Sequence, residues 1–555
     1  MTMRNHHLRI NNKTSVMATA KLPRLFLPLL LLAGSSCGIL RPYDRPNTAT
    51  TGLYRDRTPT DTTSLAQRPW QQLFTDPNLQ KLIAEGIENN RNLKVADARI
   101  AQAQALLAQS RAAFLPSLTG RATTTLSRAG GAFVSTGIGG GSTTVGGTTG
   151  TGVGGIGTGT GGTGTGGTGT GGTGTGGIGT GTGGTGTGTG TGGTGTGVGG
   201  TGTSTTTDQS TVVTGGAAHQ YLLGLSSSWE ADVWGKLRST RRAYAASVMQ
   251  SEAYRRVVLT QLIADIADNY YSLLALDAQL EITRQTVKNR IQDVETMKLL
   301  LEGDVVTGAA VVQSEANRYA AEVTIPDLER NIREAENLLA TLLGRTPGPI
   351  ARGTLTGQDV PPELLTGVPG QLLRNRPDVQ QAEYAFASNF EFTNAARTYF
   401  YPSFTITANG GLTSTTLSNL FSPTAIFASV VGGLAQPIFS QGLNRARLRR
   451  SEALQQEYLY TYQQTMFVAG QEVSNALFSY QSAADKKRIR AQQLAALNLS
   501  VDYTQELLRA GFANYTEVLQ AQQSLLQAQL NSVNDELQQR QAVTDLYHAL
   551  GGGWQ

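Results

Sequence analysis

The chain has 555 residues, a hydrophobic fraction of 39% and a formal net charge of +5. No internal stretch approaches the roughly 18 consecutive apolar residues of a membrane-spanning helix, so any membrane crossing would use strands. The first 36 residues hold five cations and no acid, which leaves 40 Lys and Arg against 40 Asp and Glu in the remainder. Because nucleic-acid binding needs a basic excess, we expect no nucleic-acid partner.

The N-terminus has the pattern of an export signal. Basic residues precede the stretch "LFLPLLLLAGSSC", whose apolar length and small flanking residues are typical of a signal peptide, which we assign to residues 1–36. Cys37 is the only cysteine, so an intrachain disulfide and a cysteine metal cluster are excluded. It is either a chance cysteine beside an ordinary cleavage site or the lipidated first residue of a bacterial lipoprotein. In the second case residues 37–69 form a lipid-anchored extension.

The rest of the chain contains an internal duplication. "RAAFLPSLT" recurs as "ARTYFYPSFT". Three pairs of matched residues define the repeat: Pro116 and Pro402, 286 apart; Gly235 and Gly442, 207 apart; and Gly303 and Gly511, 208 apart. Self-similarity at nearly fixed offsets indicates a duplicated architecture. We therefore predict a first repeat over residues 70–345, a linker over 346–371 and a second repeat over 372–555.

The change of offset locates an insertion in the first copy. The offset falls from 286 to 207 between the matched prolines and the first pair of matched glycines, and this difference equals the length of the uncharged segment 129–207. The segment is dominated by Gly and Thr, a composition that cannot bury a hydrophobic core. We assign residues 129–216 to a Gly/Thr-rich loop inserted between two elements of the first repeat.

Each half begins with a helix and two strands. Apolar spacing of three and four predicts a helix over residues 78–113. Alternation of apolar and polar residues then predicts two strands in each half, in the segments "SLTGRATTTL", "YLLGLSSSWE", "SFTITANGGL" and "IFASVVGGLAQPIF". Aromatic residues gather where strands meet helices, as in a membrane-interface girdle: Phe114, Trp229, Tyr399, Phe400, Tyr401 and Phe439. They would also suit the cap of a soluble core, but the polar second faces of the strands favour a barrel with a wet lumen.

Very long helical patterns follow the second strand of each half. They cover about residues 236–301 and 443–509, roughly 100 Å each at the rise of an α-helix. Gly235 and Gly442 mark the two strand-to-helix turns. The composition, rich in Ala, Gln, Leu and Glu, favours a long antiparallel coiled coil.

Gly303 and Gly511 interrupt these patterns, and helices return over residues 309–343 and 514–549. Four strands from one chain cannot close a barrel that leaves a channel. An open sheet edge in lipid would leave backbone groups unpaired, so an oligomer must supply the remaining strands.

With these elements in place, the sequence resembles the TolC-like outer-membrane factors of bacterial tripartite efflux systems, in their lipoprotein branch of OprM and NodT type. The resemblance covers nearly everything from Trp70 to the C-terminus except the insertion. It rests on several motifs in one order: "WQQLFTDPNLQKLIAEGIENNRNL", "WEADVWGKLR", "NLLATLLGRTPG", "LLRNRPDVQQAE", "YPSFTITANGGL", "QPIFSQG", "LLRAGFANYTEVLQAQQSLLQAQL" and "ALGGGW". It implies a mainly α fold with transmembrane β-strands: a trimeric twelve-stranded β-barrel, four strands per chain, continued by a long periplasmic α-helical coiled-coil barrel.

The same resemblance implies the function and the partners. The protein would be the outer-membrane exit duct of an efflux pump, conducting small molecules passively from the periplasm to the exterior. Its partners would be two further copies of itself, a periplasmic adaptor protein, an inner-membrane transporter of the RND class and outer-membrane lipid. Cys37 would carry the lipid anchor, and the Gly/Thr loop would face the outside of the cell. No catalytic residue, cofactor or metal is implied.

The resemblance also points to the two helix turns as functional sites. It places adaptor docking at the tips, at Gly303, Asp304, Gly511 and Phe512. Glu517 and Gln520, just after the second turn, stand where relatives have a pore-facing acidic gate. Three Glu517 carboxylates around a threefold axis would repel one another and make the closure sensitive to cations and pH. The alternative is a solvated helix carboxylate, and Ala309, the matched residue of the first half, carries no charge.

Two other classes of protein fit the sequence less well. A surface-displayed adhesive protein with a coiled-coil stalk needs only one helix per chain, whereas this sequence predicts duplicated hairpins. A diffusion porin lacks long helices. An enzyme is the least favoured class: the chain has four histidines and no metalloprotease HExxH motif, and the GxGxxG matches in the Gly tract lack a surrounding βαβ unit.

We predict that the Gly/Thr loop is dispensable. Loop-closure free energy grows only with the logarithm of loop length, so the insertion adds about 1–2 kcal/mol. A variant lacking residues 135–205 should therefore assemble into trimers and support export like the full-length chain. Native gels and an efflux assay would check this, and a deletion variant that does not assemble would contradict it.

Overall fold

The computed structural model describes residues 39–46, 52–54, 64–128, 217–357 and 371–554. It divides into two compact units, the first made of Met1–Arg121, Leu223–Leu412 and Ile426–Gln555, the second of Ala122–Leu222 and Thr413–Ala425. The predicted signal peptide, Cys37 and the Gly/Thr loop lie outside the described residues. In the second unit, two 3-10 turns, η5 (Leu417–Asn419) and η6 (Pro423–Ala425), join strands three and four.

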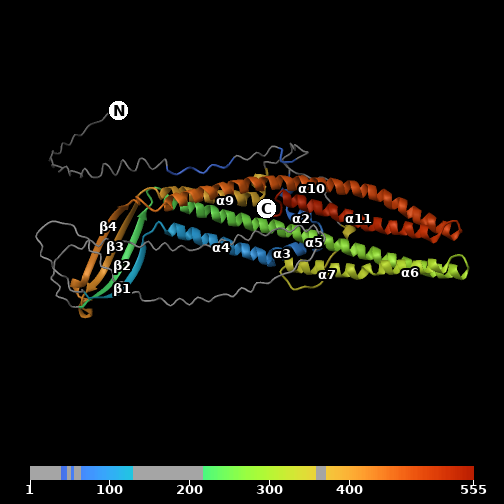
Figure 1. The fold of residues 1–555 in the computed structure, drawn as a ribbon, viewed down its shortest axis with the longest axis horizontal. Helices are drawn as coiled ribbons and strands as arrows, with labels where there is room; N and C mark the ends of the chain where they lie inside the picture. The colour runs from blue at the N-terminus through green and yellow to red at the C-terminus, as the bar shows by residue number, and fades with distance from the viewer. Residues whose placement is uncertain (1–38, 47–51, 55–63, 129–216, 358–370, 555) are drawn as a thin grey trace, which may run out of the picture. The chain divides into compact units, whose positions relative to one another are not determined.

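The elements occur in the same order in both halves of the chain (Figure 1). After η2 (Leu65–Gln67) and α2 (Trp70–Leu73), the first half consists of α3 (Pro77–Asn89), α4 (Arg91–Ala112), β1 (Ser117–Arg128), β2 (Ala217–Ala231), α5 (Lys236–Glu302), α6 (Gly308–Glu322) and α7 (Thr324–Leu342). After η3 (Leu355–Gly357), the second consists of α8 (Leu372–Asn375), α9 (Pro377–Thr398), β3 (Ser403–Ser414), β4 (Ile426–Ala435), α10 (Leu443–Arg509) and α11 (Tyr515–Ala549). The two long helices, α5 and α10, both have 67 residues.

Two predicted helices are each divided, and a single residue explains each division. The helix expected over 78–113 breaks at Asn90, whose side chain accepts hydrogen bonds from the backbone N–H groups of Asn92 and Leu93 and so starts α4. The helix expected over 309–343 breaks after Glu322. Pro326, four positions later, has no N–H to donate to the Glu322 carbonyl, and its ring crowds that oxygen.

The four strands form one sheet in the order β1-β2-β3-β4, so β1 and β4 are its edges. β3 and β4 pair antiparallel in a continuous register from Ser403 opposite Ala435 to Leu412 opposite Ile426. No helix among the described residues is long and apolar enough to cross a membrane.

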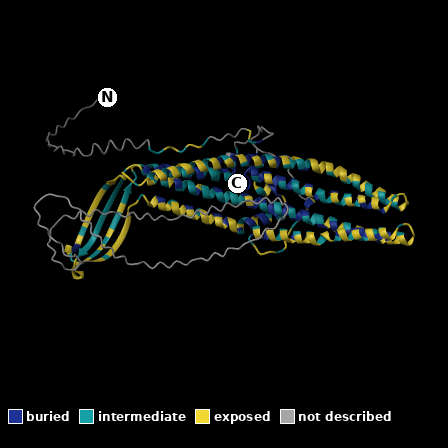
Figure 2. Cartoon of the chain, in the orientation of Figure 1, coloured by how far each residue is buried: buried dark blue, intermediate teal, exposed yellow. Residues whose placement is uncertain are grey.

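The hydrophobic core lies around the middle of α5, where buried residues gather (Figure 2). Tyr270 is fully buried there; its hydroxyl donates to Asp76 Oδ2 at 2.6 Å and accepts from the Gly353 N–H at 3.1 Å. Asp76 also caps α3 by accepting from the Asn78 N–H. One buried tyrosine therefore connects the start of α3, the long helix α5 and the inter-repeat segment.

The turns that follow α7 and α11, the helices that return from the tips (the return helices), also constrain the fold. α7 and α11 are followed by glycines with positive φ, Gly344 at +69° and Gly551 at +83°. A Cβ on Gly344 would lie 2.6 Å from the Asn89 carbonyl oxygen, and one on Gly551 would lie 2.5 Å from that of Asn375. Both positions therefore require glycine, for conformation and for space.

Side chains complete the same junction in both halves. Asn90 Nδ2 donates to the Leu342 carbonyl at 2.8 Å, and the guanidinium of Arg376 donates to the Ala549 carbonyl at 2.7 Å. These carbonyls belong to the last residues of α7 and α11. The last carbonyls of a helix have no hydrogen-bond partner within that helix. The end of α7 is thus hydrogen-bonded to the residue before α4, and the end of α11 to the residue before α9.

Arg376 forms ion pairs with Asp378 on α9 and Glu472 on α10, whereas the acids Asp268 on α5 and Asp545 on α11 interact with each other. Asp268 Oδ1 is buried without a hydrogen-bond partner among the described residues. Burial, reinforced by the charge of Asp545, raises the pKa of Asp268 to about 8, although Thr544 opposes the shift by hydrogen bonding. Burial and the nearby Arg376 lower the pKa of His548. This part of the fold therefore favours neutral side chains at Asp268 and His548.

We predict that adding one methyl group at the glycine that follows α7 or α11 destabilises the fold. Gly344→Ala or Gly551→Ala should lower the free energy of unfolding by about 2–4 kcal/mol, because a strained backbone adds to a backbone clash. Gly442→Ala is the matched control, since Gly442 has φ +79° but nothing within 4 Å of a Cβ. It should lose only about 1 kcal/mol in the same denaturation measurement. Equal losses in all three variants would contradict the clash.

We also predict that stability falls as pH rises towards 8. Folded Asp268 keeps its proton up to about pH 8, whereas the unfolded chain releases it near 3.8, so folding is favoured at the acidic end of this window. Asp268→Asn should reduce the fall in the free energy of unfolding between pH 5 and pH 8, measured by chemical denaturation. The exposed Asp502→Asn is the control and should leave the slope unchanged.

Candidate functional site

The two helix tips are closed by the same backbone motif. At the end of α5 the N–H groups of Asp304 and Val305 donate to the carbonyls of Leu301 and Leu300, and at the end of α10 those of Gly511 and Phe512 donate to Leu508 and Leu507. This is the Schellman arrangement, in which the residue after the C-cap takes a left-handed conformation. The left-handed residues are Asp304 with φ +57° and Gly511 with φ +75°.

This geometry corrects the pairing predicted from sequence. Gly303 has φ −87° and is the C-cap, so the structural counterpart of Gly511 is Asp304 and not Gly303. The predicted pairing placed two glycines together, but the backbone hydrogen bonds assign the left-handed position to an aspartate in the first half. Asp is one of the few residues with a side chain that tolerate this conformation. Glu517 then pairs with Ala310, not Ala309, and Ala310 is also uncharged.

The tips present apolar side chains to solvent. Phe512 is 84% exposed, and Val305 at the equivalent position of the first tip is 59% exposed. Such exposed large apolar side chains at two neighbouring turns are unusual on a protein surface that contacts only water.

Glu517 and Gln520 lie on the exposed side of α11, one turn apart. Glu517 is in the first helical turn, and both side chains are solvent-exposed. On the opposite side of the same turns Tyr515, Val518 and Leu519 are buried, and Tyr515 and Leu519 pack with Met297 of α5 and Val311 of α6. A carboxylate in the first turn is favoured by the helix dipole.

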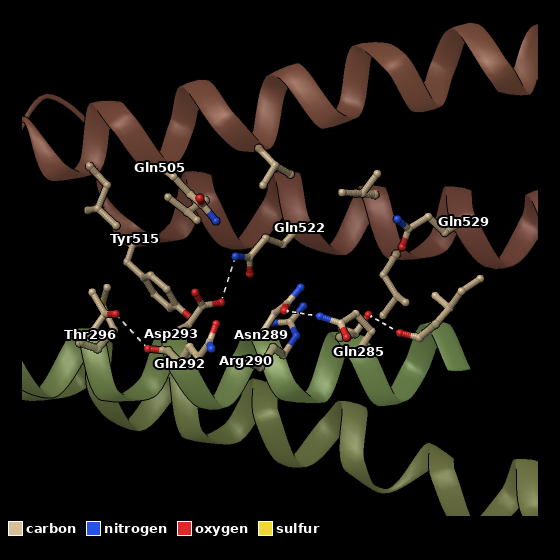
Figure 3. Close-up of a pocket in the computed structure, with 18 of the residues that line it drawn as sticks. Gln285, Asn289, Arg290, Gln292, Asp293, Thr296, Gln505, Tyr515, Gln522 and Gln529 are labelled. Carbon is tan, nitrogen blue, oxygen red and sulfur yellow. Dashed lines mark hydrogen bonds between the residues drawn. The ribbon is translucent and has the colours of Figure 1, made fainter. Parts of the chain in front are cut away.

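Polar contacts connect the two hairpins just behind the tips. The Tyr515 hydroxyl donates to Ser314 Oγ at 3.0 Å. Gln522 Nε2 donates to Asp293 Oδ2 at 2.9 Å (Figure 3). Burial raises the pKa of Asp293, an effect partly offset by the Gln522 hydrogen bond and the positive charge of Arg290. Burial likewise raises the pKa of Tyr515. Sequence reasoning did not find these residues, because their partners belong to the other half of the chain.

A cavity of 690 Å³ lies between α5, α10 and α11 behind these contacts. Amide side chains account for much of its lining, among them Gln285, Asn289, Gln505, Gln522 and Gln529 (Figure 3). Among the residues with described positions, no group of three or more His, Cys, Asp or Glu is arranged to hold a metal ion.

The strand-to-helix turns lie at the other ends of α5 and α10. Gly235 and Gly442 are the N-cap residues, with φ +78° and +79°. Asp232 accepts hydrogen bonds from the backbone N–H groups of Leu237 and Arg238 and so caps α5. A Cβ on Gly235 would lie 2.4 Å from Leu40 Cδ1, so the N-terminal segment packs directly on this turn.

The predicted aromatic residues divide into two groups. Phe114 and Trp229 are joined by a hydrogen bond from the indole N–H to the Phe114 carbonyl, and Tyr399 lies under the Arg447 guanidinium, 3.9 Å from the ring centre. Phe400, Tyr401 and Phe439 are exposed, Phe439 at 85%.

Trp234 belongs with these aromatics but was not predicted. Its ring centre lies 5.2 Å from that of Tyr401, and its indole N–H donates to the Pro402 carbonyl at 2.6 Å.

The predicted site residues form two separate sets, one at the tips and one at the strand ends. The long helices, roughly 100 Å each, lie between the two sets.

Comparison with known proteins identifies this arrangement. The family model described as outer membrane efflux protein matches residues 196–345 and 368–552. The chain is 30% identical over 340 residues to the probable outer membrane lipoprotein SilC of Salmonella typhimurium, covering 60% of this chain and 73% of that protein. It is 31% identical over 333 residues to the pyoverdine export outer membrane protein OpmQ of Pseudomonas putida, covering 60% and 70%.

Solved structures show the same fold. The outer-membrane channel OprN superposes with a TM-score of 0.72 at 22% identity, covering 93% of this chain and 99% of that one. The open state of the Neisseria gonorrhoeae MtrE outer membrane channel gives a TM-score of 0.71 at 22% identity, covering 93% and 98%. These relatives are channel and efflux proteins, not enzymes. The chain therefore belongs to the outer membrane efflux protein family and is an outer-membrane exit duct for efflux, with a periplasmic helical part, and not a surface-displayed adhesive protein.

Proposed function

We propose that three copies of this chain form one passive conduit, with a twelve-stranded barrel in the outer membrane and a coiled-coil helical barrel in the periplasm. The observation that carries the proposal is the four-stranded sheet with two edges, β1 and β4. In lipid the backbone groups of both edges need partners, and pairing with the edges of neighbouring copies supplies them. Three sheets of four strands then close the barrel.

The exposed residues of the edge strand support insertion into lipid. Val430 and Leu434 on β4 are 75% and 70% exposed, and Ile438 and Phe439 just beyond it are almost fully exposed. A row of exposed apolar side chains is stabilised by hydrocarbon and not by water. In this arrangement Phe114, Trp229 and the aromatic residues at 399–401 lie at the membrane interface, where one end of the ring is apolar and the other wet.

The lipid anchor is assigned to Cys37. Leu40, three positions later, packs on the strand-to-helix turn at Gly235. Three residues of extended chain span at most about 10 Å, so an acyl chain on Cys37 would start near the same turn. We assign residues 1–36 to the removed signal and 37–69 to the anchored extension, followed by repeats over 70–345 and 372–555 joined by 346–371.

The tips are assigned to the partners and to the gate. Their exposed apolar residues, Val305 and Phe512, suit docking of a periplasmic adaptor that connects the duct to an inner-membrane transporter of the RND class. Glu517 and Gln520 face away from the packed side of α11, so in a trimer they are available to line the closing pore. The duct carries out no chemistry in this proposal and needs no cofactor.

Single-channel recording tests this function together with the gate. The purified protein should be a trimer by native mass spectrometry and should conduct ions in planar bilayers, with a conductance that divalent cations block. Glu517→Ala should weaken that block by about tenfold, since it removes three closely spaced carboxylates from the constriction. Glu302→Ala, which also removes one exposed carboxylate per protomer but at the other tip, is the matched control and should leave the block unchanged.

The recordings test the conduit and the Glu517 gate separately. A monomer, or a trimer without conductance, would overturn the conduit itself. A conducting trimer in which Glu517→Ala and wild type show the same cation block would leave the conduit standing and reject the gate.

A further inference from the structure

The N-terminal segment 39–46, which we call the strap, lies along one face of α9. It contacts residues of α9 that recur every three or four positions: Glu383, Phe386, Phe390 and Asn394. Residues with this spacing lie on the same side of a helix. Arg397 comes three positions after Asn394, so it continues the face of α9 that the strap covers.

Asn394 brings two arginines together at one end of the strap. It is fully buried, and its Oδ1 accepts from the Arg41 backbone N–H at 3.1 Å and from Arg397 Nη1 at 2.8 Å. Its Nδ2 donates to the Arg41 carbonyl at 2.9 Å. The amide is neutral, so it fixes the positions of both arginines without balancing their charges. We call Arg41 and Arg397 the arginine pair.

The charges of the arginine pair are not balanced within the part of the chain that the structure describes. The Arg41 guanidinium is exposed and has no hydrogen-bond or ion-pair partner among those residues. Burial and the nearby positive charge of Arg41 lower the pKa of Arg397. Glu452 on α10 offsets part of this shift, but it is exposed and forms no ion pair with Arg397. Two cations therefore face one solvated acid.

Two further acids of this junction already have partners. Glu391, which also accepts from Asn394 Nδ2 at 3.2 Å, forms an ion pair with Arg242 at 2.8 Å. Asp232 forms an ion pair with Arg238 at 3.1 Å. Because each of these acids is already matched by a cation, neither compensates the arginine pair. A further anion would stabilise it.

The arginine pair lies at the depth where a membrane surface is expected. Arg397 is six residues before β3 begins, and Phe400 and Tyr401, which lie between them in the sequence, are exposed. Cys37, the proposed acylation site, is four residues before Arg41, at most about 14 Å of extended chain. Interfacial aromatic rings lie at the level of the lipid headgroups. The strap and the arginine pair are thus placed beside those headgroups.

The surrounding helix starts are basic. Residues 236–251 of α5 and 443–451 of α10 hold four Lys or Arg each and no Asp or Glu. Clustered cations next to a bilayer attract anionic lipids, and basic pockets bind their headgroups. A phosphodiester carries one negative charge on oxygens that can accept from two guanidinium groups. This chemistry matches the arginine pair.

We propose that Arg41 and Arg397 form a binding site for the phosphodiester of an anionic phospholipid, in the leaflet of the outer membrane that faces the periplasm. The phosphodiester accepts from both guanidinium groups, and the lipid tails lie in the bilayer beside the acyl chain assigned to Cys37. The site rests on the proposed membrane barrel, which sets its depth. It is far from the tips and shares no residue with the proposed gate.

Native mass spectrometry of the purified full-length protein tests the site, with phosphatidylglycerol and phosphatidylcholine of identical acyl chains as probes. Both lipids contain a phosphodiester, but the choline cation cancels its charge in the second. Wild type should therefore bind phosphatidylglycerol about tenfold more tightly than phosphatidylcholine. Arg41→Gln and Arg397→Gln should each weaken phosphatidylglycerol binding about tenfold, the loss expected for one charged hydrogen bond. Arg41 is exposed, so its variant carries the test if Arg397→Gln does not fold.

The duplication supplies a matched control. Arg111 corresponds to Arg397 at the offset of 286, is exposed, and lies six residues before β1. Ala108 stands there in place of Asn394, so the amide that holds two arginines together is missing. Arg111→Gln removes the same charge at the same distance from a strand. It should leave phosphatidylglycerol binding unchanged.

Three results would overturn the lipid site. The first is equal phosphatidylglycerol affinity of wild type and both variants of the arginine pair. The second is an equal loss in Arg111→Gln, which would assign the attraction to the general basic charge. The third is binding of glycerophosphoglycerol, the headgroup without acyl chains, as tightly as the lipid, which would assign the site to a free anion.

Planar-bilayer recording of the same samples separates this site from the proposed conduit. Channels that conduct but show one of these three results would reject the lipid site alone. A protein that does not conduct would overturn the conduit, and with it the membrane depth of the site.

Discussion

The close approach of two glycines to two backbone carbonyls determines much of this structure. At Gly344 and Gly551 the chain leaves a return helix with positive φ and passes so near the carbonyls of Asn89 and Asn375 that no side chain fits. Each contact joins the end of a return helix to the last residue of α3 or α8, the helix just before the one that leads into the sheet. The same contact occurs in both halves, and the two long helices have the same length, 67 residues.

The symmetry stops at the tips, where the two hairpins differ. Both tips have the same hydrogen-bonded turn, but the left-handed residue is Asp304 in one and Gly511 in the other. The first return helix breaks before Pro326, whereas α11 continues for 35 residues. Of the two helices that follow the tips, α11 alone carries a carboxylate, Glu517, in its first turn. Two hairpins with one backbone plan thus present different chemistry to a partner or a pore.

Burial is unevenly distributed along the helices. The core around Tyr270 is apolar and closely packed, while the region behind the tips contains cavities lined by amides and a buried guanidinium. Regions with few apolar contacts open at lower free energy than a packed core. We therefore expect the distal hairpins to open at lower free energy than the core around Tyr270.

Local sequence patterns determined the elements of this protein. Alternation identified four strands, and glycines at 235 and 442 located the starts of α5 and α10 to the residue, because period and turn residues act over a few positions. The breaks at Asn90 and Pro326 were missed although both signals are local. The pairing of Asp304 with Gly511, the contact between Tyr515 and Ser314, and the burial of the Arg290 guanidinium were decided by the tertiary structure alone. These features depend on which helix of one half faces which helix of the other. Local periodicity does not predict which side chains such a contact buries.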